Sequence, residues 1–476
     1  MFIGRHHENE ILNGFYEGDN LEIAVVTGSI GVGKSTLLKR FARENDGIYF
    51  EAYETTLRHM HSKLGEVLDI KESVDGERFC KEILRRASLK KQLIIIDQYH
   101  NIVKADPEFD KVLHDNVTGK FLKYPIKIIF CTDAFMSADK YLTGKKALWR
   151  DDITEKLDVQ AFGFYDSLAF MGDANPEEAA FLYGITGGIA YNLERVAAML
   201  GVNGFEDLGL KKAENGPNRT KEIAMRLFLD KAYSVGLNPQ RVMSTELREL
   251  AYYNYMLTCL AKGINRVNAI SAEVDKPKDV VVPYLNSLIN IGVCTKDTAI
   301  TELNNRKKTR YSIVNTSTLF WYRFLVPSYG RYCDGDLEGL WAEVESGLDD
   351  YMKQVFINIC KEYLLQQSKK EELPFTIEEM GNWWVNDDEA GTTDGFDLVS
   401  LGKCEGKSAT IYAQCYYTKE PIEVAQLKSL IEKTKQLHRN GDAFYLVFSK
   451  AGFNENAITI SSAIKNIMLI TLDEMR

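Results

Sequence analysis

The chain has 476 residues, of which 45% are hydrophobic and 26% charged, and these proportions are typical of globular rather than disordered proteins. A net charge of −10 argues against nucleic-acid binding over the whole surface, and no apolar run approaches the ~18 residues of a membrane span. Eight scattered cysteines without a CxxC pair favour a reducing compartment, and the N-terminus lacks a signal segment. We therefore expect a cytoplasmic protein of about three domains.

Residues 1–162 alternate apolar strands with helical stretches, which is the pattern of an α/β domain built on a parallel sheet. The first expected domain therefore covers residues 1–162. Its predicted strands are Ile23–Val26, Ile48–Phe50, Leu93–Ile96 and Ile126–Phe130, with a fifth near Ile153–Leu157.

The first strand runs directly into a G-x-x-x-x-G-K-S loop that opens a helix. The glycines let successive backbone N–H groups curl around a phosphate, Lys34 brings a positive charge to the β- and γ-phosphate oxygens, and the Ser35 hydroxyl is available to Mg²⁺. The pattern therefore predicts a nucleoside triphosphate site, with ATP and Mg²⁺ as the ligands. The expected nucleotide-binding residues of this loop are Gly28, Ser29, Gly31, Val32, Gly33, Lys34, Ser35 and Thr36.

A buried strand ending in an acid, Leu93–Asp97, supplies the second half of the site, and Asp97 is the expected partner of Ser35 in holding Mg²⁺. Most P-loop ATPases of this layout continue with a glutamate that orients the attacking water and takes its proton, whereas this chain has Gln98. A glutamine holds water but accepts no proton, and a general base contributes ~10²–10⁴-fold in rate. We expect tight ATP binding and slow hydrolysis. The alternative bases, each following a strand, are Glu51, Glu54 and Asp133.

The periodicity from Tyr165 to about Ala232 is helical, with an interruption at Thr186–Ile189, and residues 163–240 are expected to form a helical lid. Residues 241–331 are basic, with 13 Lys and Arg against 7 Asp and Glu. Their helices, predicted at Ser244–Leu260, Val267–Val274 and Asp279–Ile291, precede two short strands around a polar tip, which is the order of a winged helix-turn-helix.

In a winged helix that binds DNA, Lys276, Lys278 and the third helix meet the major groove, and the cations of the tip contact phosphates. The alternative is a winged helix that packs within the protein and leaves its tip in solvent. The tip cations are Arg306, Lys307, Lys308 and Arg310.

Residues 332–476 hold 14 Lys and Arg against 25 Asp and Glu. After an acidic helical connector, the expected order is a helix, a β-hairpin, a second helix and two further strands, which is the order of a restriction-endonuclease-like core. The corresponding ranges are Tyr351–Gln367, Phe396–Leu401 with Ala409–Tyr417, Ile422–Leu437, Ala443–Phe448 and Ile467–Leu472.

In this order, the segments resemble the archaeal-type P-loop ATPase family, which joins a Walker ATPase of the AAA/STAND kind to a winged helix and a C-terminal domain of PD-(D/E)xK endonuclease ancestry. The likeness covers nearly the whole chain. It implies that Arg5 contacts the nucleotide or supports its site, and that Arg150 is a cation for the γ-phosphate. For Arg150 the alternative is a surface arginine paired with Asp151 or Asp152. The matching motifs are Phe2–Arg5 with Glu8, the Walker A loop, Leu93–Asp97, Trp149-Arg150, Gly187–Tyr191, Leu319–Phe324, Gly381–Trp384 and Phe396–Val399.

The C-terminal domain departs from the resemblance at its metal site. An acid on the first helix, an aspartate on the first hairpin strand and an E-x-K on the second would hold a metal and stabilise charge on a phosphate. Asp397 is present, but Ile357 occupies the helix position and Gln414-Cys415-Tyr416 replaces E-x-K. We therefore expect no nuclease activity. The weaker substitutes are Lys419, which would lie on the opposite strand face, and Asp394 as a second acid.

We therefore expect an α/β P-loop protein with a lid (163–240), a winged helix (241–331) and an inactive endonuclease-like domain (332–476). The expected function is a nucleotide-dependent switch that fixes the lid, where Ala190 replaces the family's proline, and so exposes a surface to a partner protein or a second copy of the chain. The alternatives are an active motor-like ATPase, a DNA-binding regulator that acts through its winged helix, and a Mg²⁺-dependent nuclease.

Overall fold

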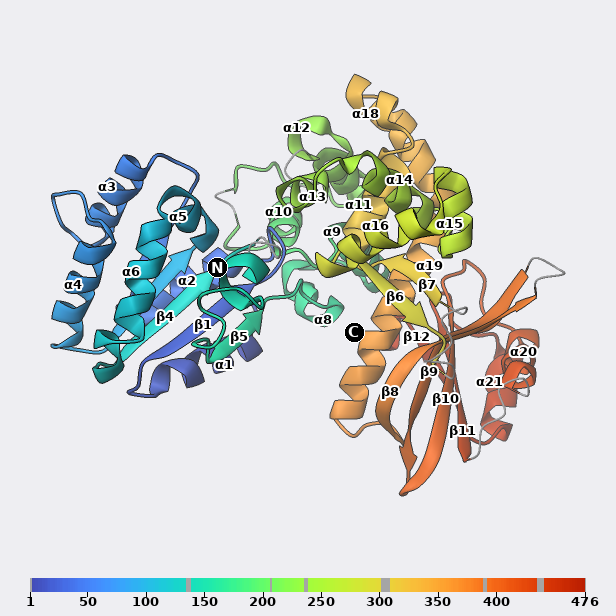
Figure 1. Cartoon of the computed structure of the whole chain (residues 1–476). Coiled ribbons are helices and arrows are strands. Elements are labelled where there is room, and N and C mark those ends of the chain that lie inside the picture. Colours follow the sequence, from blue (N-terminus) through green and yellow to red (C-terminus); the bar gives the residue numbers. More distant parts are fainter. Residues whose placement is uncertain are drawn as a thin grey trace. The chain divides into compact units, whose positions relative to one another are not determined.

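The computed structural model describes residues 2–133, 138–205, 208–234, 239–300, 309–387, 392–434 and 441–475. These residues divide into two compact units (Figure 1). The first unit contains Met1–Phe162, Ile189–Tyr191 and Gln240–Arg248, and the second contains Gly163–Gly188, Asn192–Pro239 and Glu249–Arg476.

The first unit is built on a five-stranded parallel sheet in the order β2-β3-β4-β1-β5. The predicted α/β architecture and its parallel sheet are thus confirmed. Because all strands point the same way, their carboxyl ends meet at one edge, where ligands bind in open α/β sheets. The strands are β1 (Glu22–Thr27), β2 (Ile48–Glu51), β3 (Gln92–Asp97), β4 (Ile126–Cys131) and β5 (Glu155–Asp158).

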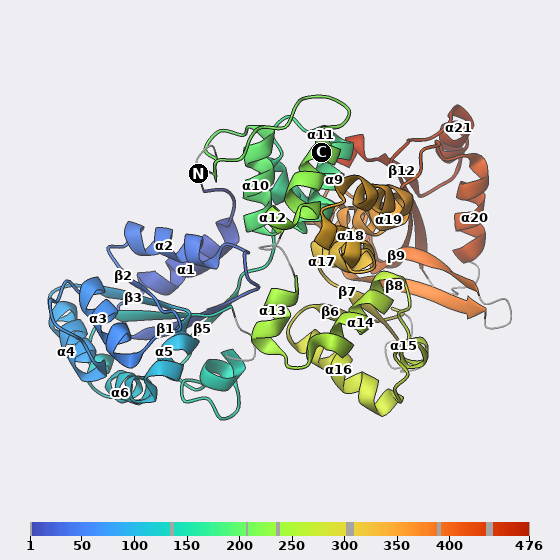
Figure 2. The ribbon, with the colours of Figure 1, turned by 90° about the horizontal axis from the view of Figure 1, so that it is seen from above.

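Helices cover both faces of this sheet, so its inner strands β1, β3 and β4 are apolar runs rather than alternating ones (Figure 2). Alternate strand residues such as Ile95 and Ile129 pack with α1 and α2, while their neighbours Ile94 and Ile128 pack with the opposite layer. The first layer is α1 (His6–Glu17) and α2 (Lys34–Glu44), and the second is α3 (Leu57–Val67), α4 (Gly76–Ala87), α5 (Tyr99–Ala105) and α6 (Pro107–Val117). Short turns follow at Lys120–Lys123 and Asp139–Thr143.

Helices make up the first part of the second unit, together with a two-stranded sheet. Within this region α14, α15 and α16 precede β6 and β7, which pair antiparallel. The helices are α8 (Phe164–Ser167), α9 (Pro176–Thr186), α10 (Ala190–Leu200), α11 (Arg219–Ala224), α12 (Lys231–Ser234), α14 (Leu250–Ala261), α15 (Val267–Val274) and α16 (Lys278–Asn290); α13 (Pro239–Glu246) lies mainly in the first unit. The strands are β6 (Cys294–Thr298) and β7 (Thr309–Ile313), and α17 (Thr316–Phe320), a turn at Trp321–Leu325 and α18 (Tyr329–Asp334) follow.

The single helix predicted over Ser244–Leu260 is wrong, because the chain breaks between α13 and α14. Glu249 has a left-handed backbone with φ of 56°, which no continuous α-helix accommodates. The tip cations Arg306, Lys307 and Lys308 lie outside the described residues.

The C-terminal part of the second unit is a five-stranded sheet in the order β12-β11-β10-β9-β8. Strands β8, β9 and β10 pair antiparallel, whereas β10, β11 and β12 pair parallel. Figure 2 shows α19 on one side of this sheet and α20 with α21 on the other. The elements are α19 (Leu337–Lys369), β8 (Thr376–Asp387), β9 (Thr392–Cys404), β10 (Lys407–Tyr416), α20 (Val424–Thr434), β11 (Asp442–Ser449), α21 (Glu455–Ala463) and β12 (Ile467–Thr471).

Helix α19 is about twice the length predicted, because the acidic connector, which was expected to be helical, joins the helix predicted at Tyr351–Gln367 without a break. Among the described residues, none of the helices has both the length and the apolar character needed to cross a bilayer.

Candidate nucleotide site

The loop between β1 and α2 follows a path that its glycines make possible. Gly28, Gly31 and Gly33 have φ of 144°, 82° and 98°, a region in which L side chains are strained. A Cβ atom on Gly28 would lie 2.3 Å from the Val159 carbonyl oxygen, so this position also excludes a side chain on space alone. Backbone N–H groups in the first turn of α2 have no partner within the helix, which makes the end of this loop a site for an anion.

Lys34 places its ammonium within the curl of the loop. Its Nζ donates to the carbonyl oxygens of Gly28 and Ser29 at 2.8 and 2.9 Å, and the residue is 5% exposed. The segment predicted as the lid also contacts the loop, because the Tyr191 N–H donates to the Gly31 carbonyl at 3.0 Å. A positive charge at this depth fits an anionic ligand.

Asp97 lies fully buried at the carboxyl end of β3 and accepts three hydrogen bonds. The hydroxyls of Ser35 and Tyr49 donate to its Oδ2 at 2.6 and 2.5 Å, and the Gln98 N–H donates to Oδ1 at 2.8 Å. Burial and the Asp97 carboxylate raise the pKa of Tyr49, so its phenol keeps its proton and remains a donor. The structure thus brings together Ser35 and Asp97, the two residues expected to hold Mg²⁺, with oxygen ligands that suit this cation.

Gln98 follows Asp97 with a left-handed backbone (φ of 55°) at the start of α5. The three alternative bases differ in their surroundings. Glu51 lies beside Asp97 in the β2–β3 register, but its carboxylate is paired with Lys39 at 2.7 Å. Glu54 is exposed and Asp133 is half-buried, and neither takes part in an ion pair within the described residues.

His100 and Thr132 add polar groups that the sequence analysis missed. The His100 Nδ1 lies 3.0 Å from the Thr132 hydroxyl, which follows β4 as Asp97 ends β3. Burial, and then the charge of Lys104, lower the pKa of His100, so its neutral form is favoured. Both residues lie at the carboxyl edge of the sheet, near enough to Asp97 for its charge to act on the imidazole.

Arg5 braces the loop. Its guanidinium donates to the carbonyl oxygens of Val32 and Gln160 at 2.6 and 2.8 Å and to the Glu8 carboxylate at 2.6 Å. It also lies 3.9 Å from the centre of the Phe162 ring. These contacts occupy the guanidinium with protein groups, which places Arg5 in support of the loop.

Arg150 lies at the surface. Its side chain is 51% exposed, and the nearest acid, Asp151, lies 4.0 Å away. The preceding Trp149 is instead buried in the core, where its indole N–H donates to Asp110 at 2.7 Å. Within the described residues Arg150 makes no hydrogen bond or ion pair to the loop, so its surroundings match the surface alternative.

The second unit buries the carboxylate of Asp397. Its Oδ2 accepts from the Gln414 amide at 2.7 Å and from the Cys415 N–H at 2.8 Å, and the Lys353 ammonium lies 3.8 Å from Oδ1. Burial raises the pKa of Asp397. Within the described ranges, no group of three His, Cys, Asp or Glu side chains is placed to hold a metal ion. Ile357 is half-buried, Lys419 is exposed, and the Asp394 side chain lies outside the described residues.

Residues 321–428 match the family DUF234, described as archaea bacterial proteins of unknown function. An uncharacterized protein of Methanocaldococcus jannaschii is 26% identical over 418 residues, which are 86% of each chain. Among solved structures, a Walker-type ATPase of Pyrococcus abyssi has a TM-score of 0.49 at 15% identity, covering 68% of this chain and 96% of its own. The ORC2 protein of Aeropyrum pernix, solved with ADPNP and ADP, has a TM-score of 0.47 at 12% identity, covering 71% and 95%. The chain is thus similar to archaeal proteins that include a Walker-type ATPase.

Proposed function

We propose that this protein binds Mg-ATP in the loop of residues 28–36 and hydrolyses it slowly, so that the bound nucleotide acts as a switch. The observation that carries the proposal is the hydrogen-bonded cluster of Ser35, Asp97 and Tyr49 beside the buried ammonium of Lys34. The loop backbone and Lys34 would hold the phosphates, and Ser35 and Asp97 would hold Mg²⁺. When bound, the cation supplies charge that offsets the phosphate oxygens.

Slow hydrolysis is proposed because no carboxylate stands in the place of the general base. Gln98 can orient a water molecule by hydrogen bonding but takes no proton from it. Glu51 lies beside Asp97 across the sheet, but its carboxylate contacts Lys39 at 2.7 Å and is thus engaged by a surface cation rather than by the site. A bound ATP would therefore persist for much longer than in an ATPase with a glutamate at this position.

The switch would act through segments that touch the loop. Tyr191, at the start of α10, donates to Gly31, and Arg5 links Val32 to Gln160, so a change in the loop would reach the start of α10 and the segment that follows β5. We assign residues 163–240 as the lid, 241–331 as a winged helix and 332–476 as an inactive endonuclease-like domain. A partner protein or a second copy of the chain would recognise the ATP-bound form.

Binding of DNA through the winged helix has less support. Arg310 of the expected tip lies 4.4 Å from the centre of the Trp384 ring, and burial and then Arg266 lower its pKa to about 10. Ile300 donates to the Asn382 carbonyl at 3.0 Å, and its side chain joins the core formed by Trp383 and Trp384. These contacts favour a winged helix that packs within the second unit.

Equilibrium binding of ATP with and without Mg²⁺ tests the proposal. We expect binding by the natural protein, loss of binding in Lys34→Ala, and loss of the Mg²⁺-dependent part of the affinity in Asp97→Asn. The matched control is Lys39→Ala, a lysine of the same helix that is paired with Glu51 at the surface. Equal binding by all four proteins would refute the assignment of this site.

A further inference from the structure

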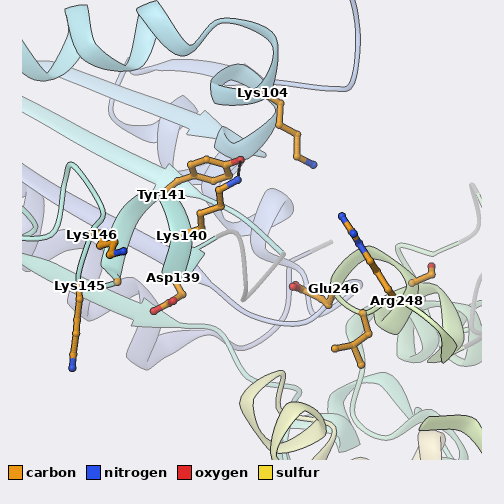
Figure 3. A pocket seen from close by; sticks show the side chains of 11 residues that line it. Lys104, Asp139, Lys140, Tyr141, Lys145, Lys146, Glu246 and Arg248 are labelled. Atoms are coloured by element: carbon orange, nitrogen blue, oxygen red, sulfur yellow. Dashed lines mark hydrogen bonds between the residues drawn. The ribbon is translucent and has the colours of Figure 1, made fainter. Parts of the chain in front are cut away.

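We propose that a basic hollow on the first unit, apart from the nucleotide loop, binds the phosphodiester backbone of nucleic acid without regard to sequence. The basic hollow is a cavity of about 910 Å³ (Figure 3). Its lining contains five cations, Lys104, Lys140, Lys145, Lys146 and Arg248, and two acids, Asp139 and Glu246.

Three parts of the chain build the basic hollow. Lys104 stands at the end of α5, residues 139–146 follow β4, and Arg248 comes after α13. In Figure 3 the side chains of Lys104 and Arg248 extend toward each other from opposite sides, and Lys140 lies between α5 and the turn that carries Lys145. All these residues belong to the first unit, so the basic hollow is a feature of one compact body.

The five cations of the basic hollow lack carboxylate partners within the described residues. All are exposed, and Lys140 donates to the Tyr141 hydroxyl at 2.8 Å. Some other exposed lysines of this unit are paired, as are Lys39 with Glu51 and Lys63 with Glu66. Lys71 and Lys81 are not paired in the part of the chain that the structure describes, and the five cations differ from these two in lining one cavity. Five cations that repel one another, in a protein of net charge −10, indicate a ligand that neutralises several of them at once.

The arrangement fits an extended polyanion better than a single phosphate group. Lysine ammonium groups are mobile point charges, and the site has one arginine to offer a planar fork, so it selects charge rather than shape. Backbone phosphates spaced along a strand can meet cations spread over a wide cavity, and such contacts carry no sequence information.

Fluorescence anisotropy of labelled random-sequence DNA, single-stranded and duplex, tests this inference over a series of salt concentrations. The key variant is Lys104→Gln with Arg248→Gln. The control is Lys71→Gln with Lys81→Gln, which removes two exposed lysines from another part of the same unit and changes the net charge equally. All proteins are first compared for ATP affinity and thermal unfolding at pH 8, where His100 is neutral with or without the charge of Lys104, and we expect both to be unchanged because the four side chains form no hydrogen bond or ion pair within the described residues.

We expect the natural protein and the control to bind DNA with similar affinity and salt dependence. In the key variant the plot of log affinity against log salt should be shallower by about 2, one for each cation removed. Absence of DNA binding by the natural protein, or an equal loss in the control, would overturn the proposal. So would a loss caused by Arg306→Gln with Lys307→Gln but not by the key variant. Inorganic pyrophosphate or phosphatidylserine vesicles bound by the natural protein, with no DNA binding, would identify a different ligand and refute it.

Discussion

Replacement of Arg5 tests whether one side chain holds the phosphate-binding loop in shape. The Arg5 side chain is 6% exposed and makes three charge-assisted hydrogen bonds, two of them to the carbonyls of Val32 and Gln160. Bonds from charged donors contribute roughly 1.5–3 kcal/mol each, and removing one member of a buried ion pair costs ~3–5 kcal/mol. We therefore expect Arg5→Ala to lower the unfolding free energy of the first unit by ~3–5 kcal/mol.

Arg5→Lys separates the charge from the geometry. A lysine keeps the positive charge beside Glu8 but lacks the planar fork that reaches two carbonyls at once. Arg5→Lys should therefore lower the unfolding free energy of the first unit by about half as much as Arg5→Ala does. The matched control is Arg40→Ala. Arg40 also lies over an aromatic ring, that of Phe2, and pairs with an acid, Glu44, but it is 42% exposed. Its loss should cost no more than ~1 kcal/mol.

Hydrogen exchange followed by mass spectrometry provides both readouts. Peptides of β1 report the unfolding free energy of the first unit, and peptides of residues 28–38 report local opening of the loop. Relative to the natural protein, we expect Arg5→Ala to increase the exchange rate more in the loop than in β1. We also expect it to lower the ATP affinity tenfold or more. If Arg5→Ala cost no more than Arg40→Ala, or if the loop exchanged as in the natural protein, the bracing role of Arg5 would be wrong.

Three further substitutions give distinct expectations. Tyr49→Phe removes a hydrogen bond to the buried Asp97 carboxylate and should lower the unfolding free energy of the first unit by ~1.5–3 kcal/mol in urea titrations; no change would show that Tyr49 is dispensable. Because burial lowers the pKa of His100 in the folded state, the unfolded chain binds more protons just below pH 6.5 and the first unit loses stability on acidification. His100→Asn should flatten this pH dependence, and an identical slope in the variant would contradict the assignment. Gln414→Glu places a second carboxylate beside Asp397 and should destabilise the second unit by ~2–4 kcal/mol; full recovery on addition of Mg²⁺ would reveal a metal site after all.

Strands of the first unit could be predicted from the sequence because burial on both faces leaves uninterrupted apolar runs. Leu93–Ile96 and Ile126–Phe130 correspond to β3 and β4, and the fifth predicted strand, near Ile153–Leu157, overlaps β5. Their spatial order could not be predicted, because apolar runs such as Ile23–Val26 carry no record of which neighbour they pair with. The order β2-β3-β4-β1-β5 comes from packing across the sheet.

Helix breaks that occur without a glycine or proline also could not be predicted from the sequence. The stretch between α13 and α14 contains Leu247, Arg248 and Glu249, of which none is a strong helix breaker, and the turn results from tertiary structure. The acidic connector was expected to be helical, but its continuity with the helix predicted at Tyr351–Gln367 was not, because charged residues with helical spacing suit an exposed helix face whether or not a break follows.

The candidate site was predicted where one motif contains it and missed where distant segments meet. The loop and Asp97 are recognisable from local patterns, whereas Tyr49 and Thr132 come from other strands. Tyr49 lies on the same sheet face as Ile95, and hence as Asp97 two residues later, but only because β2 pairs with β3 in this register. The contact between His100 and Thr132 likewise depends on the pairing of β3 with β4, so the sequence held no signal for either contact.

Single-turnover hydrolysis of ATP by the natural protein and by Gln98→Glu, with Lys34→Ala as the control that lacks binding, tests the central claim most directly. A switch that lacks its general base should bind ATP and convert it slowly, and the introduced glutamate should raise the rate by ~10²-fold or more. Rapid hydrolysis by the natural protein, with no gain in Gln98→Glu, would contradict the account. Another carboxylate would then act as the base, and Glu51, Glu54 and Asp133 would be the next residues to replace.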